Sequence, residues 1–347
     1  MPNWTELLRT GVSRGASDIF LSAGSAPTVR VNGALERLDG QDELPASQAR
    51  DMLVSLLQRE PHEVVNGIQD LDLAYQHHEI GRFRVNIFQH LRGFGAVFRV
   101  IPSVPPRLSE LVSEGQLALS TLPSLAEHSH GLVLFVGSTV SGKSSTQAAV
   151  VDLLNRQGRR HIICVEDPIE FVHASTEGLV HQRQVGTHVA SFADALRAAL
   201  RENPDVIVIG ELRDASSIQL ALTAAETGHL VLGTCHASSA VHCVARLLEG
   251  LPEAHRSQAR GVLAASLVSV VYQRLMLGSA NRRIAAFEIL KATPAVRHLI
   301  RESKPAQLHS VMQTGRQQGM QTMEQALQEL TDIGVLAAPQ RPEPLPS

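Results

Sequence analysis

Residues 131–145 read GLVLFVGSTVSGKSS, and this stretch decides the fold class of the chain. It begins with a continuous apolar run, which is typical of a strand buried on both faces of a parallel sheet. Residues 137–144 match the phosphate-loop pattern G-x-x-x-x-G-K-[ST], and helical spacing begins at Lys143. In a strand–loop–helix context, backbone N–H groups and the helix N-terminus bind phosphate oxygens. The stretch therefore predicts an α/β nucleotide-binding domain.

The loop also predicts its cofactors, ATP and Mg²⁺. We expect Lys143 to reach the β- and γ-phosphates and the Ser144 hydroxyl to ligate Mg²⁺. Backbone N–H groups of the loop are expected to surround the phosphate oxygens. The predicted nucleotide-binding residues of this stretch are Gly137, Ser138, Thr139, Val140, Ser141, Gly142, Lys143, Ser144 and Ser145.

Apolar runs and helical patterns alternate around the loop, as a parallel sheet of the α/β type requires. The predicted strands are 131–136, 161–165, 205–209 and 230–234. The predicted helices between them are 143–156, 191–202 and 214–227. The rest of this domain, residues 252–334, is predicted to be mostly helical.

Carboxylates follow two of these strands, at the edge where α/β proteins bind their ligands. Glu211 follows the third strand, where it could ligate Mg²⁺, orient a water molecule, or act only as a helix N-cap. Glu166 and Glu170 follow the second strand, with Asp167 between them. They could supply a general base for the attacking water, or form only a solvated turn. Spacing alone does not decide which carboxylate activates water.

One histidine and several arginines complete the candidate site. His236 follows the fourth strand and could hydrogen-bond the γ-phosphate, with a purely structural histidine as the alternative. Phosphoryl transfer in oligomeric NTPases often uses an arginine from a neighbouring subunit. The candidate arginines of the first hundred residues include Arg82, Arg84 and Arg99, for which a surface charge is the alternative.

Residues 1–101 form a separate pattern, with helical spacing at 4–13 and 46–59. The predicted strands of this block are 19–21, 28–33, 71–75, 81–88 and 95–101. Because the strands alternate with short turns, we expect an antiparallel α+β domain. A proline cluster marks a linker at 102–109, and the second domain then covers 110–338. The proline-rich tail 339–347 is predicted to be disordered.

The composition excludes several classes of protein. Of the 347 residues, 44% are hydrophobic and 19% charged, so the chain can bury a sizeable core. A net charge of −3 and an aromatic content of 3% argue against general nucleic-acid binding. The three cysteines are too few for a disulfide framework and indicate reduced thiols in a cytoplasmic protein. We find no secretory signal or transmembrane segment, so membrane association is expected to be peripheral.

Five blocks of the chain resemble the secretion ATPase superfamily, and within it the hexameric pilus retraction ATPases that power twitching motility. The resemblance extends from about residue 16 to about residue 330. The blocks are the phosphate loop, the Asp box 165–173, the Walker B block 204–214, the His box 233–240 and the C-terminal block 295–302. The C-terminal block, AVRHLIRE, is the most discriminating, because assembly and secretion ATPases share the other four.

The resemblance implies a PAS-like domain joined to a RecA-like ATPase domain, assembled as a homo-hexamer with ATP between the two domains. It gives Glu170 and Glu211 catalytic or Mg²⁺-linked roles and His236 a part in the nucleotide site. It also implies that phosphate-proximal arginines, from the same or a neighbouring subunit, are among Arg82, Arg84 and Arg99. Hydrolysis would move an inner-membrane platform protein so that pilin leaves the fibre base. The motor would then be cytoplasmic and peripherally associated with the inner membrane.

The chain departs from the family pattern at a few positions. Ser138 and Val140 stand where the family loop usually has Pro and Gly, and a β-branched residue resists the positive φ that Gly would ease. Cys235 replaces a usual Leu, and the C-terminal block has Val296 and His298 where Ile and Asn are more common. These changes fit a paralogue with weaker or specialised retraction activity, acting alone or beside a second pilus motor ATPase.

Three other functions stay open. An assembly or secretion ATPase of the same superfamily usually carries a longer N-terminal region and a four-cysteine zinc motif, which we do not find in this sequence. A nucleic-acid motor is disfavoured by the charge and the scarcity of aromatic residues. A nucleotide-binding accessory ring subunit with weak turnover agrees with the substituted loop, although the catalytic carboxylates weigh against it.

Overall fold

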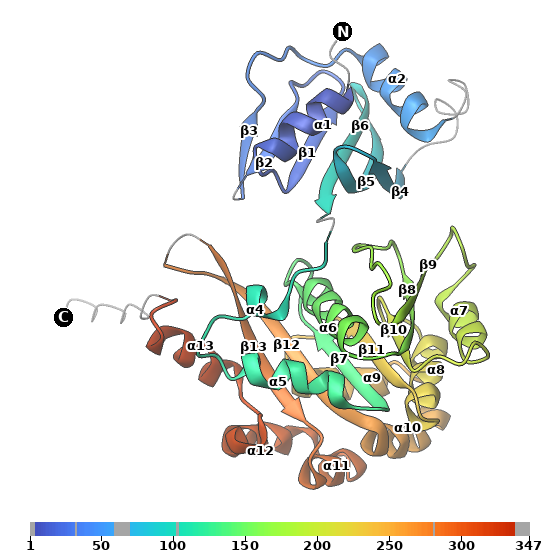
Figure 1. Ribbon diagram of the computed structural model, residues 1–347, viewed down its shortest axis with the longest axis vertical. Coiled ribbons are helices and arrows are strands. Elements are labelled where there is room, and N and C mark those ends of the chain that lie inside the picture. Colours follow the sequence, from blue (N-terminus) through green and yellow to red (C-terminus); the bar gives the residue numbers. More distant parts are fainter. Residues whose placement is uncertain (1–3, 32, 59–69, 102–103, 280–281, 337–347) are drawn as a thin grey trace, which may run out of the picture. The chain divides into compact units, whose positions relative to one another are not determined.

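The computed structural model describes residues 4–31, 33–58, 70–101, 104–279 and 282–336, and the tail predicted at 339–347 lies outside these ranges. Contacts divide the chain into two compact units, Met1–Val104 and Pro105–Ser347. The division falls inside the proposed linker 102–109, and each unit has its own sheet (Figure 1).

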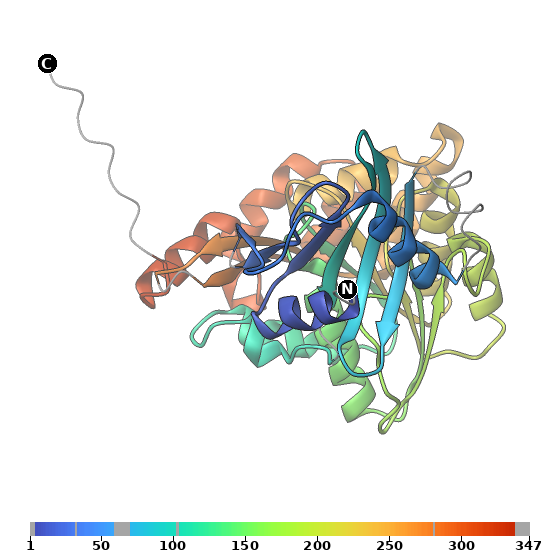
Figure 2. The same ribbon diagram turned by 90° about the horizontal axis from the view of Figure 1, so that it is seen from above.

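The N-terminal unit is an antiparallel sheet of six strands in the order β3-β2-β1-β6-β5-β4. The strands are β1 (Asp18–Ser22), β2 (Thr28–Val31), β3 (Ala34–Arg37), β4 (Asp70–His77), β5 (Gly81–His90) and β6 (Gly93–Ile101). Helices α1 (Trp4–Ser13) and α2 (Ala46–Leu57) pack on one face of it (Figure 2). There Leu8 and Leu53 share a core with Phe83 and Phe98.

This unit agrees with the predicted antiparallel α+β arrangement, except that β3 was not predicted. All four residues of β3 are exposed, so the strand carries no alternation of apolar and polar residues. It forms because the backbone of β2 pairs with it, Val29 opposite Glu36.

The C-terminal unit is a seven-stranded sheet in the order β13-β12-β7-β11-β10-β8-β9, in which only β13 runs antiparallel to its neighbour. Its strands are β7 (Gly131–Val136), β8 (His161–Glu166), β9 (Leu179–Gln184), β10 (Val206–Ile209), β11 (Leu230–Cys235), β12 (Leu267–Leu277) and β13 (Arg283–Lys291). The predicted α/β fold class is confirmed.

Helices cover both faces of this sheet (Figure 1). They are α4 (Leu108–Leu111), α5 (Ala118–Ser124), α6 (Lys143–Gln157), α7 (Phe192–Ala199), α8 (Ala215–Glu226), α9 (Ala240–Glu249), α10 (Glu253–Ser266), α11 (Pro294–Arg301), α12 (Leu308–Thr314) and α13 (Met323–Asp332), with 3₁₀ turns η1 (Leu125–Glu127), η2 (Pro305–Gln307) and η3 (Arg316–Gln318). The residues of β7 show why both faces of the sheet are covered. Leu132 and Leu134 pack in the core under α8 and α10, while Val133 and Phe135 pack in the core under α5 and α6. A strand buried on both faces needs the continuous apolar run seen in the sequence.

The prediction that residues 252–334 are mostly helical was wrong over β12 and β13. β12 pairs in parallel with β7, and β13 closes the sheet as an antiparallel edge strand. In β12, the polar side chains of Ser269 and Gln273 interrupt the apolar run, yet both are buried. Periodicity cannot separate such a strand from a buried helix, because both faces of the strand are covered. Strand β9 was also missed, since its residues are mostly polar.

The carboxyl ends of β7, β8, β10 and β11 meet at one edge of this sheet, because the four strands are parallel neighbours. The phosphate loop, the two carboxylate segments and His236 follow these four strands. Within the described ranges, no helix is both long enough and apolar enough to cross a bilayer.

Candidate functional site

The phosphate loop turns tightly against strand β12. A Cβ atom on Gly137 would lie 2.6 Å from the carbonyl oxygen of Gln273, and one on Gly142 would lie 2.6 Å from the Nε2 atom of the same side chain. Gly142 also has a φ of 88°, in the left-handed region that favours glycine, and α6 begins directly after it. Gly137 is therefore required by the backbone of β12, and Gly142 by its left-handed conformation.

Ser141 indicates that the loop is built to hold a ligand. Its hydroxyl oxygen is buried, and among the described residues it has no hydrogen-bond partner. Leaving a buried hydroxyl unpaired costs about 1–3 kcal/mol, so such a group in a folded protein usually has a purpose. A phosphate oxygen would accept a hydrogen bond from it. Together with the close approach at the glycines, this donor fits the phosphates of a nucleotide.

Lys143 lies under the loop in the first turn of α6. Its ammonium donates hydrogen bonds to the carbonyl oxygens of Gly137 and Ser138, at 2.9 and 2.8 Å, and the residue is 8% exposed. Burial lowers the pKa of Lys143, while electrostatic interactions with Glu211, Cys235 and Glu170 oppose that shift. The lysine is thus held where phosphate oxygens would replace the two carbonyls. Ser144 and Ser145 follow it in the same turn, half-buried.

Val140 has a φ of 64° and is 60% exposed. The structure therefore agrees with the expectation that this position needs a positive φ. Left-handed backbone costs a residue with a Cβ about 1–2 kcal/mol, and a β-branched side chain makes the conformation still less common. The tip of the loop is consequently strained at Val140, beside Thr139 and Ser138, which are exposed as well.

Gln273 is a site residue that the sequence analysis missed. It projects from β12 and is 2% exposed. Its side-chain oxygen accepts a hydrogen bond of 2.7 Å from Thr146 in α6, and its backbone and amide lie against the two loop glycines. Gln273 thus fixes the loop and the start of α6 from a strand that is more than a hundred residues away in sequence. Gln273 belongs to none of the motifs found in the sequence. Its role is to support the loop, and a residue that does not contact the predicted ligand carries no ligand-binding pattern.

Glu211 lies at the carboxyl end of β10, where it contacts the side chains of an arginine and a histidine. One carboxylate oxygen is 2.6 Å from a guanidinium nitrogen of Arg213, and the other is 3.2 Å from Nε2 of His236. The Thr234 hydroxyl donates a hydrogen bond of 2.5 Å to the carbonyl of Gly210, which ties the ends of β10 and β11 together. The structure therefore brings the predicted Glu211 and His236 into direct contact.

Glu211 does not act as a helix N-cap, which was the alternative to a catalytic or Mg²⁺-linked role. Asp214 caps α8 instead, because its side chain accepts a hydrogen bond from the backbone N–H of Ser217. Hydrogen bonds from Ser217 lower the pKa of Asp214 although partial burial opposes them. Glu211 is left facing His236 and the phosphate loop, where its charge acts on Lys143.

Glu166 and Glu170 occupy different positions in the Asp box. One oxygen of Glu166 accepts a 3.0 Å hydrogen bond from Gln182, and the other accepts a 3.3 Å bond from the backbone N–H of Glu170. Glu166 therefore orders the turn that carries Glu170. The charge of Glu170 acts on Lys143 of the phosphate loop.

The predicted arginines lie on the face of the N-terminal sheet opposite to its helices, since their neighbours in β5 and β6 are buried. Arg99 pairs with Asp18 at 2.9 Å, and Arg84 lies 3.7 Å from Asp72. Arg82 donates a weak hydrogen bond of 3.4 Å to the side chain of Gln76. Arg84 and Arg99 are directly opposite each other in the sheet.

The donors for Mg²⁺ are few. Across the described ranges no three His, Cys, Asp or Glu side chains are grouped as a metal site. Mg²⁺ in nucleotide enzymes is commonly bound by one or two protein oxygens together with substrate phosphates. Ser144 in α6 and Glu211 after β10 fit that pattern, because both belong to the edge that holds the loop.

A family model described as type II/IV secretion system protein matches residues 6–336. The chain belongs to this family. It is 43% identical over 334 residues to the type IV pilus retraction ATPase PilT of Pseudomonas aeruginosa, covering 96% of this chain and 95% of that protein. It is also 43% identical over 332 residues to a twitching motility protein of Neisseria gonorrhoeae, covering 95% of this chain and 87% of that protein.

The fold has a close structural counterpart. A crystal structure of the pilus retraction motor PilT with bound ADP superposes with a TM-score of 0.86 at 37% sequence identity. The match covers 96% of this chain and 94% of the other. The predicted membership of the secretion ATPase superfamily is thereby confirmed.

Proposed function

We propose that this chain is an ATP-hydrolysing motor that drives retraction of type IV pili. The observation that carries the proposal is the sheet edge where Lys143, Glu211 and His236 meet, in a chain similar over nearly its whole length to a pilus retraction ATPase. Lysine and backbone N–H groups for phosphates, beside a carboxylate, form the arrangement that NTP hydrolysis needs.

Each residue has a role in the proposed reaction. Lys143 exchanges its loop carbonyls for β- and γ-phosphate oxygens and offsets their charge. Either Glu170 or Glu211 orients the attacking water, and His236, in contact with Glu211, responds to loss of the γ-phosphate. Ser144 and Glu211 would hold Mg²⁺, which neutralises phosphate charge when bound. Glu166 positions the turn of Glu170.

The proposed assembly is a homo-hexamer. In such a ring, Arg82, Arg84 or Arg99 would approach the phosphates of its own or a neighbouring subunit. The pair that Arg84 makes with Asp72 is partly exposed on both sides, and such pairs contribute little stability, so this guanidinium can change partner at small cost. Arg99 pairs with Asp18, which is buried, so its release would cost more.

The proposed partners follow from the function. The ring would act in the cytoplasm, held peripherally at the inner membrane by a platform protein of the pilus machine. A second pilus motor ATPase could share the work. Nucleic acid is not among the proposed partners, since the chain is close to electrically neutral.

Hydrolysis by the purified chain tests the proposal. We expect Mg²⁺-dependent ATP turnover from a particle near six chains, reduced at least about 100-fold by Glu211→Ala. Glu253→Ala, at an exposed glutamate of α10, is the matched control and should leave turnover within about twofold.

The number of surface pili on cells that lack the gene distinguishes a retraction motor from an assembly motor. If the chain drives retraction, pili should accumulate and twitching should be lost, and the wild-type gene but not the Glu211→Ala variant should reverse both effects. Loss of surface pili would contradict retraction and indicate an assembly ATPase.

A second candidate function is a nucleotide-binding accessory ring subunit. The strained φ of Val140 at the loop tip favours it, because a misplaced loop backbone would slow turnover without preventing binding. Nucleotide binding without measurable turnover by the chain alone would support this alternative.

A further inference from the structure

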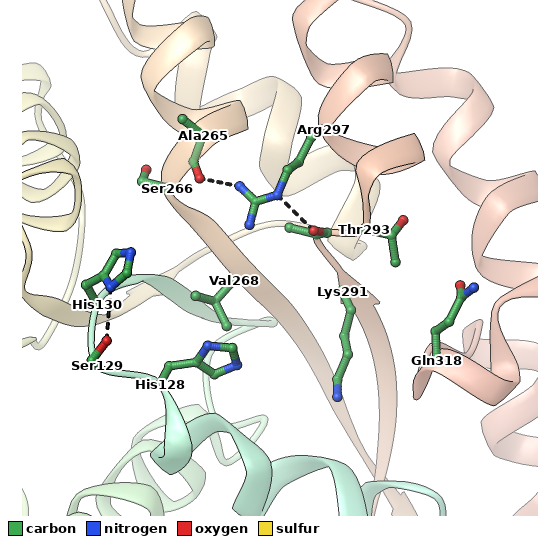
Figure 3. Close-up of a pocket in the computed structure, with 11 residues that line it drawn as sticks. His128, Ser129, His130, Ala265, Ser266, Val268, Lys291, Thr293, Arg297 and Gln318 are labelled. Carbon is green, nitrogen blue, oxygen red and sulfur yellow. Dashed lines mark hydrogen bonds between the residues drawn. The ribbon is translucent and has the colours of Figure 1, made fainter.

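A second charged site lies at the opposite edge of the C-terminal sheet. A cavity of about 350 Å³ opens beside the amino end of β7, where His128 and His130 precede Gly131. Lys291, at the end of β13, and Arg297, in α11, line the same cavity. Figure 3 shows these side chains reaching the cavity from separate elements of the unit.

The lining of this cavity carries basic side chains and no acidic ones. Its lining contains two histidines, a lysine and an arginine, and no Asp or Glu. In the part of the chain that the structure describes, neither Lys291 nor Arg297 forms an ion pair with a carboxylate. Both side chains are half-buried, so water solvates and screens their charges less than it would on an open surface. A ligand that supplies negative charge would be stabilised there.

Arg297 is held rigidly and still has donors to spare. Its Nε donates to the carbonyl of Ala292 at 3.0 Å, and Nη1 donates to the carbonyls of Ala264 and Ala265 at the end of α10. Within the described residues the Nη2 group has no hydrogen-bond acceptor. The guanidinium is thus fixed by backbone carbonyls while one of its nitrogens remains available.

Lys291 and His128 add donors from other directions. The Lys291 ammonium donates one 3.3 Å hydrogen bond to Ser124, which leaves two of its three N–H groups for a ligand. His128 lies exposed at the rim, and its side chain lines the same cavity as Lys291 (Figure 3). Partial burial and the nearby positive charge of Lys291 lower the pKa of His128, while the negative charge of Glu127 opposes them.

We propose that this cavity binds a small organic phosphate through Arg297, Lys291 and His128. A carboxylate has two acceptor oxygens, whereas a terminal phosphate has three, so a phosphate can accept hydrogen bonds from more than one of these elements. The volume exceeds what one phosphate group fills, which leaves room for the organic group that carries the phosphate. Because the cavity and the phosphate loop lie at opposite edges of the sheet, the two sites can be filled independently.

Calorimetry on the full-length protein, with the nucleotide site saturated by Mg²⁺ and ADP, tests this site. Pyrophosphate is the probe, and a fluorescent ADP analogue in parallel samples verifies that the nucleotide site stays filled. We expect one additional pyrophosphate site per chain. Lys291→Gln should weaken it at least tenfold, and Lys304→Gln, the same change at an exposed lysine outside the cavity, should not.

Three results would overturn the proposal. They are no pyrophosphate binding once ADP is saturating, equal affinity in Lys291→Gln and the wild type, or glutarate binding as tightly as pyrophosphate. The last would assign the cavity to carboxylates. His128→Gln, at the exposed rim, provides a second variant if Lys291→Gln does not fold, and it should weaken pyrophosphate binding at least threefold. Basal ATP turnover should be unchanged in both variants.

Discussion

The two edges of the C-terminal sheet place their cations in opposite surroundings. At the edge of the phosphate loop, Lys143 is buried and donates hydrogen bonds to two loop carbonyls, and it interacts electrostatically with Glu211 and Glu170. At the other edge, Lys291 and Arg297 line a cavity without any Asp or Glu. The first edge balances its charges within the protein, and the second leaves them for a ligand.

The difference shows how two anion sites can be built on one sheet. The loop binds through its backbone geometry, with Gly137 and Gly142 packed against Gln273. A contiguous motif makes this loop recognisable in the sequence. The cavity relies on side chains from three separate parts of the chain, of which only Arg297 belongs to a recognised block, 295–302. Catalysis needs the balanced arrangement, because a carboxylate must act beside the phosphates.

The largest expected effect separates the two lysines. Lys143→Ala should lower the kcat for ATP hydrolysis by at least about 100-fold, since the charge facing the transferred phosphate is lost. Lys291→Gln should change it by less than about twofold. A coupled phosphate-release assay on both variants measures this. Equal losses would mean that the two edges are not independent.

The second effect concerns the support of the loop. Gln273→Ala removes a buried side chain and leaves the Thr146 hydroxyl without its partner, which should cost about 3 kcal/mol of unfolding free energy. Gln318→Ala, an exposed glutamine lining the cavity at the opposite edge, should change it by less than about 0.5 kcal/mol. Urea denaturation compares them. A stable Gln273→Ala protein would contradict the supporting role of β12.

The third effect depends on pH. Burial lowers the pKa of His173, in the Asp box, to about 4, against an unfolded value of about 6.5. A lowered folded pKa means that the stabilisation is present above pH ~6.5 and is lost as pH falls towards 4. From pH 7 to 5 this group should remove about 2 kcal/mol of unfolding free energy.

His173→Gln isolates that contribution. The variant should lose less stability than the wild type between pH 7 and pH 5, as measured by urea denaturation at each pH. His298→Gln, the same change at an exposed histidine of α11, should keep the wild-type dependence. Parallel pH dependences in wild type and His173→Gln would contradict the buried neutral histidine.

The smallest effect concerns the strained loop tip. Val140→Gly should raise the unfolding free energy by about 1 kcal/mol, because glycine adopts a φ of 64° without the cost that valine has. Turnover should rise with it if strain limits the loop. Val172→Gly, an exposed valine outside the set of positive φ residues, should instead be neutral or destabilising. Thermal unfolding and the ATP assay compare the two.

The sequence predicted the parallel core of the C-terminal sheet and the residues that meet at its carboxyl edge. It could do so because Gly137–Ser144 is a contiguous motif and because β7, β8, β10 and β11 are continuous apolar runs. It failed for β12, whose buried Ser269 and Gln273 resemble the polar interruptions of a helix. β3 and β9 carry too few apolar residues to stand out.

What the sequence determined by itself is the identity of the phosphate loop, the four parallel strands β7, β8, β10 and β11 with the helices between them, and the family of the chain. These depend on local patterns, in which neighbouring residues serve the same turn or the same strand. Only the tertiary structure decided that Gln273 supports the loop, that His236 contacts Glu211, and that Lys291 and Arg297 share a cavity. Such contacts join residues far apart in the chain, and their formation depends on how the strands pair and the helices pack.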